Sequence, residues 1–326
     1  MVECRRKFGQ LILPIFFDVK TSDVRHQTGS YKEAFQKHEE KYGSATQEGW
    51  KKALTEVGQL KGPKARRRSD KEVVSKEWRE LKKNYSLVVK ECLVGIDDHE
   101  EQMTKLCVNS NDVRIVGIHG MGGIGKTTVA KVIYNKLSRQ FQSRCFLEDV
   151  RKTAQQPNGL VHLQNQLIPS FLKQGRPILI ESMDEGIFAI KSRFSGKKVL
   201  VVDDVDHRNH LHAFALLGKC DWFGSGSRII ITTRNQEILK LVEVNSTYNP
   251  KELDSDQSLQ LFSRNAFRRD YPPEDYDTLS RDVVSTTGGL PLALELIGSS
   301  LSGKGKEAWE GTLKKLKRIP NVCSRS

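Results

Sequence analysis

The stretch "GIHGMGGIGKTT", residues 117–128, limits the folds open to this chain more than any other feature of its sequence. Gly120, four intervening residues and then Gly125, Lys126 and Thr127 follow the P-loop pattern. An apolar run, "VRIVGIHG", leads into the loop, and the helical pattern "VAKVIYNKL" leads out of it. A strand, a glycine-rich loop and a helix in this order predict an α/β fold with a parallel sheet and a phosphate site at the loop.

Each fixed position of this loop has a chemical purpose. Glycines let backbone N–H groups wrap phosphate oxygens without a Cβ clash, and the loop glycines are Gly120, Gly122, Gly123 and Gly125. The helix that begins near Lys126 adds its positive dipole end. We expect Lys126 to reach the β- and γ-phosphates and the Thr127 hydroxyl to bind Mg²⁺. A glycine-rich turn that binds nothing is the alternative, and the complete set of fixed positions disfavours it.

Two further segments end in polar residues that suit a nucleotide site. In "VLVVDDVD" an apolar strand runs into Asp203 and Asp204, the Walker B arrangement. We expect Asp203 to hold the water shell of Mg²⁺ and Asp204 to polarise an attacking water. In "GSRIIITTR", Arg234 follows a second apolar strand, where its guanidinium can contact a γ-phosphate. An ion pair with a neighbouring carboxylate is the alternative for Arg234.

The pattern along the chain predicts two subdomains after residue 90. Strands are expected at 113–120, 145–151, 197–205 and 227–234, with helical stretches between them. This alternation is typical of a parallel sheet covered by helices on both faces. After residue 250 the patterns are helical and predict a small bundle; they cover 256–267, 276–301 and 307–319.

The pattern of the first 90 residues predicts only part of a domain. Residues 10–19 have the pattern of one buried strand, 30–42 and 48–60 look helical, and no convincing second strand is found. A lone parallel strand leaves backbone groups unpaired, so this segment is interpreted as the back half of an α/β domain. Residues 63–90 are interpreted as a linker.

Charge and cysteines narrow the class of protein. The net charge is +13, and residues 1–90 contain 21 Lys and Arg against 12 Asp and Glu. The densest basic run, at 64–71, is interpreted as a solvated linker; nucleic-acid binding is the disfavoured alternative because no aromatic residues interleave with the arginines. No apolar run has the roughly 20 residues of a membrane span.

The cysteines are scattered along the chain, which indicates reduced thiols rather than disulfide bonds. A cytoplasmic or nuclear protein is therefore expected. These cysteines are Cys4, Cys92, Cys107, Cys145, Cys220 and Cys323.

Three histidines, His207, His210 and His212, lie in a polar stretch after the Walker B strand. A zinc site needs a fixed geometry and a further ligand, so zinc binding is disfavoured.

With these motifs in this order, the chain resembles the plant TIR-type nucleotide-binding, leucine-rich-repeat disease-resistance proteins. The resemblance spans nearly the whole sequence. It rests on "LVGIDDHEEQM", "GMGGIGKTT", "FLEDVR", "VLVVDDVD", "GSRIIITTR" and "GGLPLAL", which follow one another in the family's order. The segment "LPIFFDVKTSDVRHQTGSYKEAF" resembles the second half of a TIR domain, which is flavodoxin-like in the family.

The resemblance implies ADP or ATP as ligand, with Mg²⁺, and a switch that is off with ADP and on with ATP. On the family pattern, Val94 and Gly95 line the adenine, and Pro291 of "GLPLA" closes over the nucleotide. The implied phosphate and magnesium contacts are Gly123, Gly125, Lys126, Thr127, Thr128, Asp203, Asp204 and Arg234.

The expected domain organisation follows from the motifs and the resemblance together. It comprises a partial TIR-like segment at 1–62, a basic linker at 63–90, a P-loop nucleotide-binding domain at 91–250, a helical subdomain at 251–320 and a tail at 321–326. The first TIR strands and the catalytic helix of that domain find no counterpart here, so NAD⁺ hydrolysis is not expected. The family's winged-helix subdomain and repeats find none either.

Three functions are weighed. The favoured one is an ATP- or ADP-binding regulatory module of a plant immune receptor, with slow hydrolysis at most and with other TIR-type receptors or signalling proteins as partners. The alternative is a non-catalytic, truncated interaction partner or decoy of full-length receptors. A metabolic P-loop ATPase or kinase is disfavoured because no substrate-acceptor segment is apparent. Rapid turnover would indicate the third function, and nucleotide binding with little turnover the first.

Overall fold

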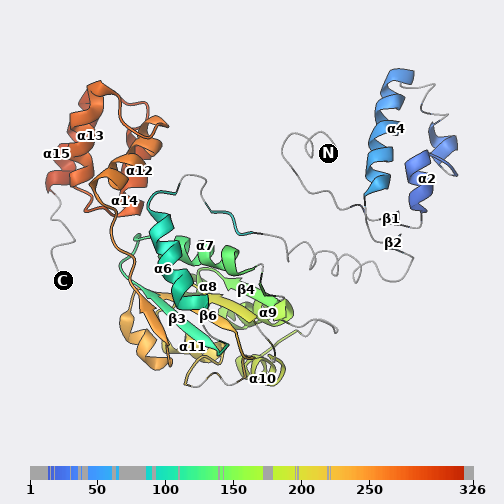
Figure 1. Ribbon diagram of the computed structural model, residues 1–326, viewed down its shortest axis with the longest axis horizontal. Helices are drawn as coiled ribbons and strands as arrows, with labels where there is room; N and C mark the ends of the chain where they lie inside the picture. Colours follow the sequence, from blue (N-terminus) through green and yellow to red (C-terminus); the bar gives the residue numbers. More distant parts are fainter. Residues whose placement is uncertain are drawn as a thin grey trace. The chain divides into compact units, whose positions relative to one another are not determined.

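A computed structural model gives the arrangement of the chain (Figure 1). It divides into two units, Met1–Tyr85 and Ser86–Ser326, which are described separately. The structure describes residues 14, 16–17, 19–29, 31–35, 38, 43–60, 64–65, 86–89, 93–108, 111–138, 140–141, 143–171, 179–194, 196, 198–218, 220 and 222–318. Most of the predicted strand at 10–19 and of the predicted linker, the tail at 321–326, and Cys4, Cys92 and Cys323 lie outside these residues.

The first unit contains a parallel strand pair that the sequence does not predict. Strand β1 (Phe16–Phe17) pairs with β2 (Lys64–Ala65), and helices α2 (Thr21–His26) and α4 (Ser44–Gln59), with further helical residues at 31–35, lie between them in the chain. The expectation that residues 1–90 hold no second strand is therefore wrong. A two-residue strand at the start of the basic run has no apolar alternation, so only its pairing partner reveals it.

The second unit is built on a five-stranded sheet in the order β4-β5-β6-β3-β7, with every pairing parallel. The strands are β3 (Arg114–His119), β4 (Ser143–Leu147), β5 (Lys198–Val202), β6 (Arg228–Thr233) and β7 (Ser246–Tyr248). Three of them, β3, β5 and β6, coincide with predicted strands, and β4 overlaps the predicted strand at 145–151 in part. The fifth, β7, is only three residues long, and the sequence analysis misses it.

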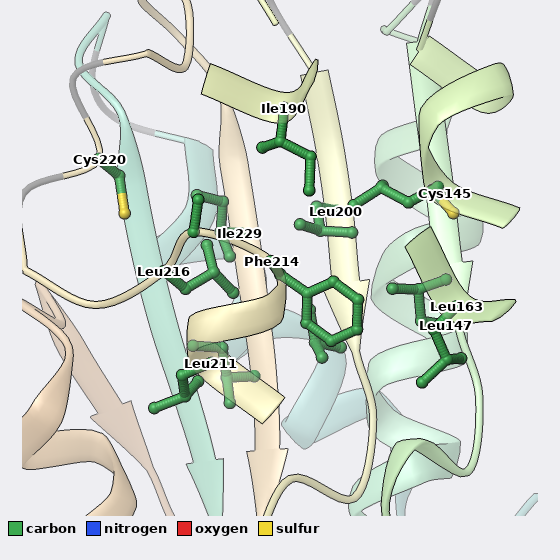
Figure 2. Close-up of a cluster of buried hydrophobic side chains, with 14 of the residues drawn as sticks. Cys145, Leu147, Leu163, Ile190, Leu200, Leu211, Phe214, Leu216, Cys220 and Ile229 are labelled. Carbon is green, nitrogen blue, oxygen red and sulfur yellow. The ribbon is translucent and has the colours of Figure 1, made fainter. Parts of the chain in front are cut away.

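Both faces of this sheet are buried, as parallel strands require. Along β5, Val199 and Val201 pack into one apolar cluster while Leu200 and Val202 pack into another. Helices α6 (Ile96–Val108) and α7 (Lys126–Ser138) supply the first cluster. The second, part of which is drawn in Figure 2, is supplied by other helices. These are α8 (Val150–Ala154), α9 (Gly159–Phe171), α10 (Met183–Arg193) and α11 (Arg208–Ala213).

Two predicted boundaries are wrong, for local reasons. The predicted strand at 145–151 ends at Leu147, because Asp149 takes a left-handed conformation (φ 52°) and α8 begins directly after it. The predicted helix at 276–301 is two helices, α13 (Asp277–Ser285) and α14 (Pro291–Leu301). The break follows from Gly288 and Gly289, both at positive φ, and from a proline that suits a first helical position.

The C-terminal bundle has an apolar core of its own, built around the buried ring of Trp309. Phe267 stacks on this ring, and Phe262 meets it edge to face. The first helix begins with a capping box, in which Asp254 and Gln257 satisfy each other's backbone N–H groups. The bundle consists of α12 (Ser255–Phe267), η2 (Glu274–Tyr276), α13, α14 and α15 (Lys306–Arg318).

One short 3-10 helix, η1 (Gln236–Leu241), completes the second unit. Among the described residues, none of the helices combines the length and the apolar character needed to cross a membrane.

Helices α12 and α14 approach so closely that one position excludes a side chain. A Cβ atom on Gly298 would lie 2.9 Å from the backbone oxygen of Phe262 and 3.0 Å from the Cβ of Asn265. We expect Gly298→Ala to lower the free energy of unfolding by ~1–3 kcal/mol, the typical cost of overpacking. Urea denaturation followed by circular dichroism measures this change.

The matched control is Gly311→Ala in α15, where a Cβ would meet nothing within 4 Å. The same substitution should raise stability there by ~0.5–1 kcal/mol, because alanine favours the helix. Equal effects at the two positions would contradict the packing argument.

Candidate functional site

The candidate site lies where three neighbouring strands end. In the sheet register Ile118 is opposite Thr232 and Val202 is opposite Ile231, so β3, β5 and β6 finish at one edge. The glycine-rich loop follows β3, the two aspartates follow β5, and Arg234 follows β6. Ligand sites on open parallel sheets form at this carboxyl edge.

The loop folds back on its own lysine. Lys126, at the first position of α7, is buried, and its Nζ donates to the backbone oxygens of Gly120 and Met121 at 2.8 Å each. Burial lowers the pKa of Lys126, and the nearby Arg234 guanidinium lowers it further. The glycines Gly120, Gly123 and Gly125 have φ of 147°, 84° and 97°, conformations that residues with a Cβ rarely adopt.

Asp203 joins the loop helix to the sheet. The Thr127 hydroxyl donates to its carboxylate oxygens at 2.9 and 3.1 Å, and the Thr232 hydroxyl donates to Oδ1 at 2.6 Å. The side chain is fully buried. Burial raises the pKa of Asp203, while the hydrogen bonds from Thr232 and Thr127 act in the opposite direction.

Asp204 lies between two arginines. Its Oδ2 is 2.9 Å from Nη2 of Arg151, and its Oδ1 is 3.6 Å from Nε of Arg234. Its φ is 57°, in the left-handed region, and its N–H donates to Thr232 Oγ1 at 2.8 Å. The ion pair with a carboxylate, which the sequence analysis gives as the alternative for Arg234, is therefore present, while the guanidinium is half exposed.

The helical bundle contacts the loop directly. The Leu292 N–H, in the first turn of α14, donates to the backbone oxygen of Gly123 at 3.2 Å, and Pro291 precedes it as the first residue of that helix. Val94 packs against the apolar core of the bundle, and a Cβ on Gly95 would lie 3.0 Å from Gln257 Oε1.

Two other residues expected at the site lie on the loop and on its helix. Thr128 is half-buried in α7. Gly122 lies beside Arg234, whose Nη1 atom is 3.1 Å from the position that a Cβ on Gly122 would take.

Two of the histidines after β5, His207 and His210, have local contacts. His207 caps α11 by accepting a hydrogen bond from the Asn209 N–H at 3.1 Å, and the ring of His210 is buried and faces Asp206. Within the described residues, no group of three or more His, Cys, Asp or Glu side chains is placed to hold a metal ion.

The geometry thus brings loop amides, a buried ammonium, two carboxylates and two guanidinium groups to one sheet edge. Such a set of groups is suited to bind a polyphosphate together with its metal counter-ion.

Comparison with known proteins places the same residues in a known domain. The family model of the NB-ARC domain matches residues 96–271, just over half of the chain, and that of the TIR domain matches residues 1–109.

This chain belongs to the NB-ARC family. Together with the curated relatives described below, the two matches confirm the resemblance to TIR-type plant disease-resistance proteins, and the NB-ARC match indicates a nucleotide-binding module. The two model matches overlap at 96–109, and the TIR match extends beyond the predicted boundary at residue 62.

The curated relatives of this chain are also plant disease-resistance proteins. The chain is 42% identical to disease resistance protein RPV1 of Vitis rotundifolia, over 99% of this chain and 23% of that protein. It is 41% identical to disease resistance protein RUN1 of the same organism, over 99% and 24%. It is 37% identical to TMV resistance protein N of Nicotiana glutinosa, over 97% and 28%. The chain thus spans about a quarter of the length of these relatives.

Sequence reasoning gave no role to two residues that hold this site together. Thr232 precedes Arg234 by two residues in "GSRIIITTR"; its hydroxyl donates to the Asp203 carboxylate and accepts from the Asp204 N–H. Arg151 was placed inside a predicted strand, although it lies in α8 and pairs with Asp204. The position of Thr232 at the end of β6 is a signal that the sequence offers. Arg151 ends "FLEDVR", one of the motifs that carry the resemblance, but that motif does not indicate its partner.

Replacing Thr232 tests how the strand ends are joined. Thr232→Val removes the donor of the buried bond to Asp203 and the acceptor of the part-buried bond from the Asp204 N–H, so we expect a loss of ~1.5–3 kcal/mol in unfolding free energy. Thr233→Val is the matched control, because the Thr233 hydroxyl bonds only the backbone of Asn235 among the described residues. Its loss should be ~0.5–1.5 kcal/mol. Urea denaturation of the nucleotide-free protein measures both losses, and equal losses would contradict this role for Thr232.

Proposed function

We propose that this chain is the nucleotide-binding regulatory module of a plant immune receptor, and that it binds ADP or ATP with Mg²⁺. The observation that carries the proposal is the convergence of the P-loop, Asp203 and Arg234 at one sheet edge, in a chain of the NB-ARC family. The curated relatives are plant disease-resistance proteins, which supports a role in defence signalling.

In this proposal the phosphates lie along the loop. Lys126 exchanges its bonds to the loop carbonyls for bonds to the β- and γ-phosphates, and the amides of the glycine loop bind the other phosphate oxygens. The N-terminus of α7, which includes Thr128, faces them with its positive dipole end. Arg234 is the group that distinguishes ATP, which has a γ-phosphate, from ADP, which lacks one. Its guanidinium is half exposed and lies beside the loop.

The residues present suit Mg²⁺. A carboxylate and a hydroxyl already within hydrogen-bond distance of each other, Asp203 and Thr127, are hard oxygen donors of the kind that this ion prefers. Bound there, Mg²⁺ would neutralise phosphate charge. The short bond from Thr232 holds the carboxylate in place for this purpose.

The base of the nucleotide belongs, in this proposal, near Val94 and Gly95. Both residues contact the helical bundle, and the same bundle reaches the loop through Leu292 and Pro291. A nucleotide between the loop and the bundle would therefore couple the two subdomains, which is the physical requirement for a switch.

Hydrolysis is expected to be slow. Asp204 is the candidate for activating a water, and both of its carboxylate oxygens face a guanidinium group. Because both oxygens already pair with a guanidinium group, neither is free to accept a proton from a water. Binding with little turnover is therefore the expected behaviour.

Thermal denaturation tests the binding. At about 100 times Kd, a ligand stabilises the folded state by ~2.7 kcal/mol, which for a module of this size raises the melting temperature by ~5–10 °C. Lys126→Ala or Thr127→Ala should remove most of that rise, because each deletes a proposed phosphate or magnesium contact.

The control is Lys136→Ala at the far end of α7, where the lysine pairs with Glu100 on the surface. This variant should keep the full rise. A melting temperature of the unchanged protein that responds to neither ADP nor ATP would refute the proposed function.

A further inference from the structure

The two arginines that flank Asp204 hold it unequally. Arg151 approaches one carboxylate oxygen at 2.9 Å, whereas Arg234 stands 3.6 Å from the other. The side chain of Arg151 is 33% exposed and that of Arg234 is 52% exposed. The closer and better covered arginine is therefore the principal partner of this carboxylate.

The backbone fixes Arg151 in the same place. The N–H groups of Val150 and Arg151 donate to the carbonyl oxygens of Asp203 and Asp204 at 3.0 and 3.2 Å. The start of α8 is thus tied to the chain segment that carries both aspartates. A second carboxylate, that of Asp206, is 3.8 Å from Nε of Arg151 and adds to its anchorage.

Arg234 has a different neighbourhood. Its guanidinium packs beside Gly122 of the loop, and its charge acts on the Lys126 ammonium, as do the charges of Asp204, Asp203 and Arg151. All of these groups therefore belong to one electrostatic cluster at the loop. In that cluster, each carboxylate that draws Arg234 away competes with a phosphate for the same cation.

We propose that Arg151 is a positioning residue for nucleotide discrimination: by holding the Asp204 carboxylate, it leaves Arg234 available for a γ-phosphate. The inference rests on the proposed function and deepens it. Arg151 does not contact the phosphate in this scheme; it acts through Asp204. Without Arg151, the Asp204 carboxylate, only 19% exposed, lacks its close partner and draws Arg234 into a close ion pair.

Calorimetric titration of the whole 326-residue chain with ADP and with a non-hydrolysable ATP analogue, with Mg²⁺ in every sample, tests this. In Arg151→Gln we expect the affinity for the ATP analogue to fall about tenfold or more relative to that for ADP, the value of a charge-assisted bond. Adding Asp204→Asn to Arg151→Gln should restore the ratio, because the competing carboxylate is gone.

Two controls separate positioning from mere stability. Lys152→Gln removes a neighbouring positive charge from an exposed side chain of the same helix, and should leave both affinities unchanged. Arg151→Lys keeps a cation beside Asp204 and should keep most of the ratio. Melting curves establish that each variant is folded.

The outcomes are distinct. An Arg151→Gln variant whose two affinities fall equally, or whose ratio is not restored by Asp204→Asn, would overturn the inference while leaving nucleotide binding intact. If Arg151→Gln does not fold, Asp204→Asn alone decides, because a lowered preference for the ATP analogue there contradicts competition for Arg234. An unchanged protein that binds neither nucleotide would refute the proposed function as well.

Discussion

The hydrogen bonds accepted by the carboxylate of Asp203 hold the rest of the site together. Asp203 ends β5, accepts hydrogen bonds from Thr127 of α7 and Thr232 of β6, and is shielded from solvent. A buried carboxylate is costly unless it is fully hydrogen-bonded, so these hydroxyl groups are obligatory partners rather than incidental neighbours. Because they come from a helix and an adjacent strand, the same bonds that satisfy the charge also fix the loop against the sheet.

These hydrogen bonds can form only because the strands are in register. The register in turn follows from the burial of both faces of the sheet. Val199 and Val201 point into one apolar cluster, Leu200 and Val202 into the other. A slip of β5 by one residue would exchange the two sets and move Asp203 away from the end of β6. The apolar cores on either side of the sheet are therefore what brings three strand ends, and hence the candidate site, to a common edge.

The sequence contained enough to predict the sheet, the loop and the aspartates, because long apolar strands and a spaced glycine motif are local signals. The strands β2 and β7 were missed because two or three residues show no periodicity, and their pairing partners are remote in sequence. Arg151 was missed for another reason. Its position depends on a left-handed turn at Asp149 that ends β4 early, and no residue pattern in "CFLEDVR" marks that turn.

The charges explain why the site can respond to a ligand. The two cations beside the loop have weak partners: Lys126 donates to neutral loop carbonyls, and Arg234 stands 3.6 Å from the Asp204 carboxylate. A phosphate oxygen would offer each of them a charge-assisted bond, which is the stronger kind. In the proposed function, Lys126 and Arg234 would therefore exchange their present partners for phosphate oxygens. The loop carbonyl of Gly123 meanwhile accepts the Leu292 N–H of the helical bundle. A ligand shifts an equilibrium only through contacts that differ between states. If the proposed function holds, this backbone bond is the contact through which a change in the loop would reach the helical bundle.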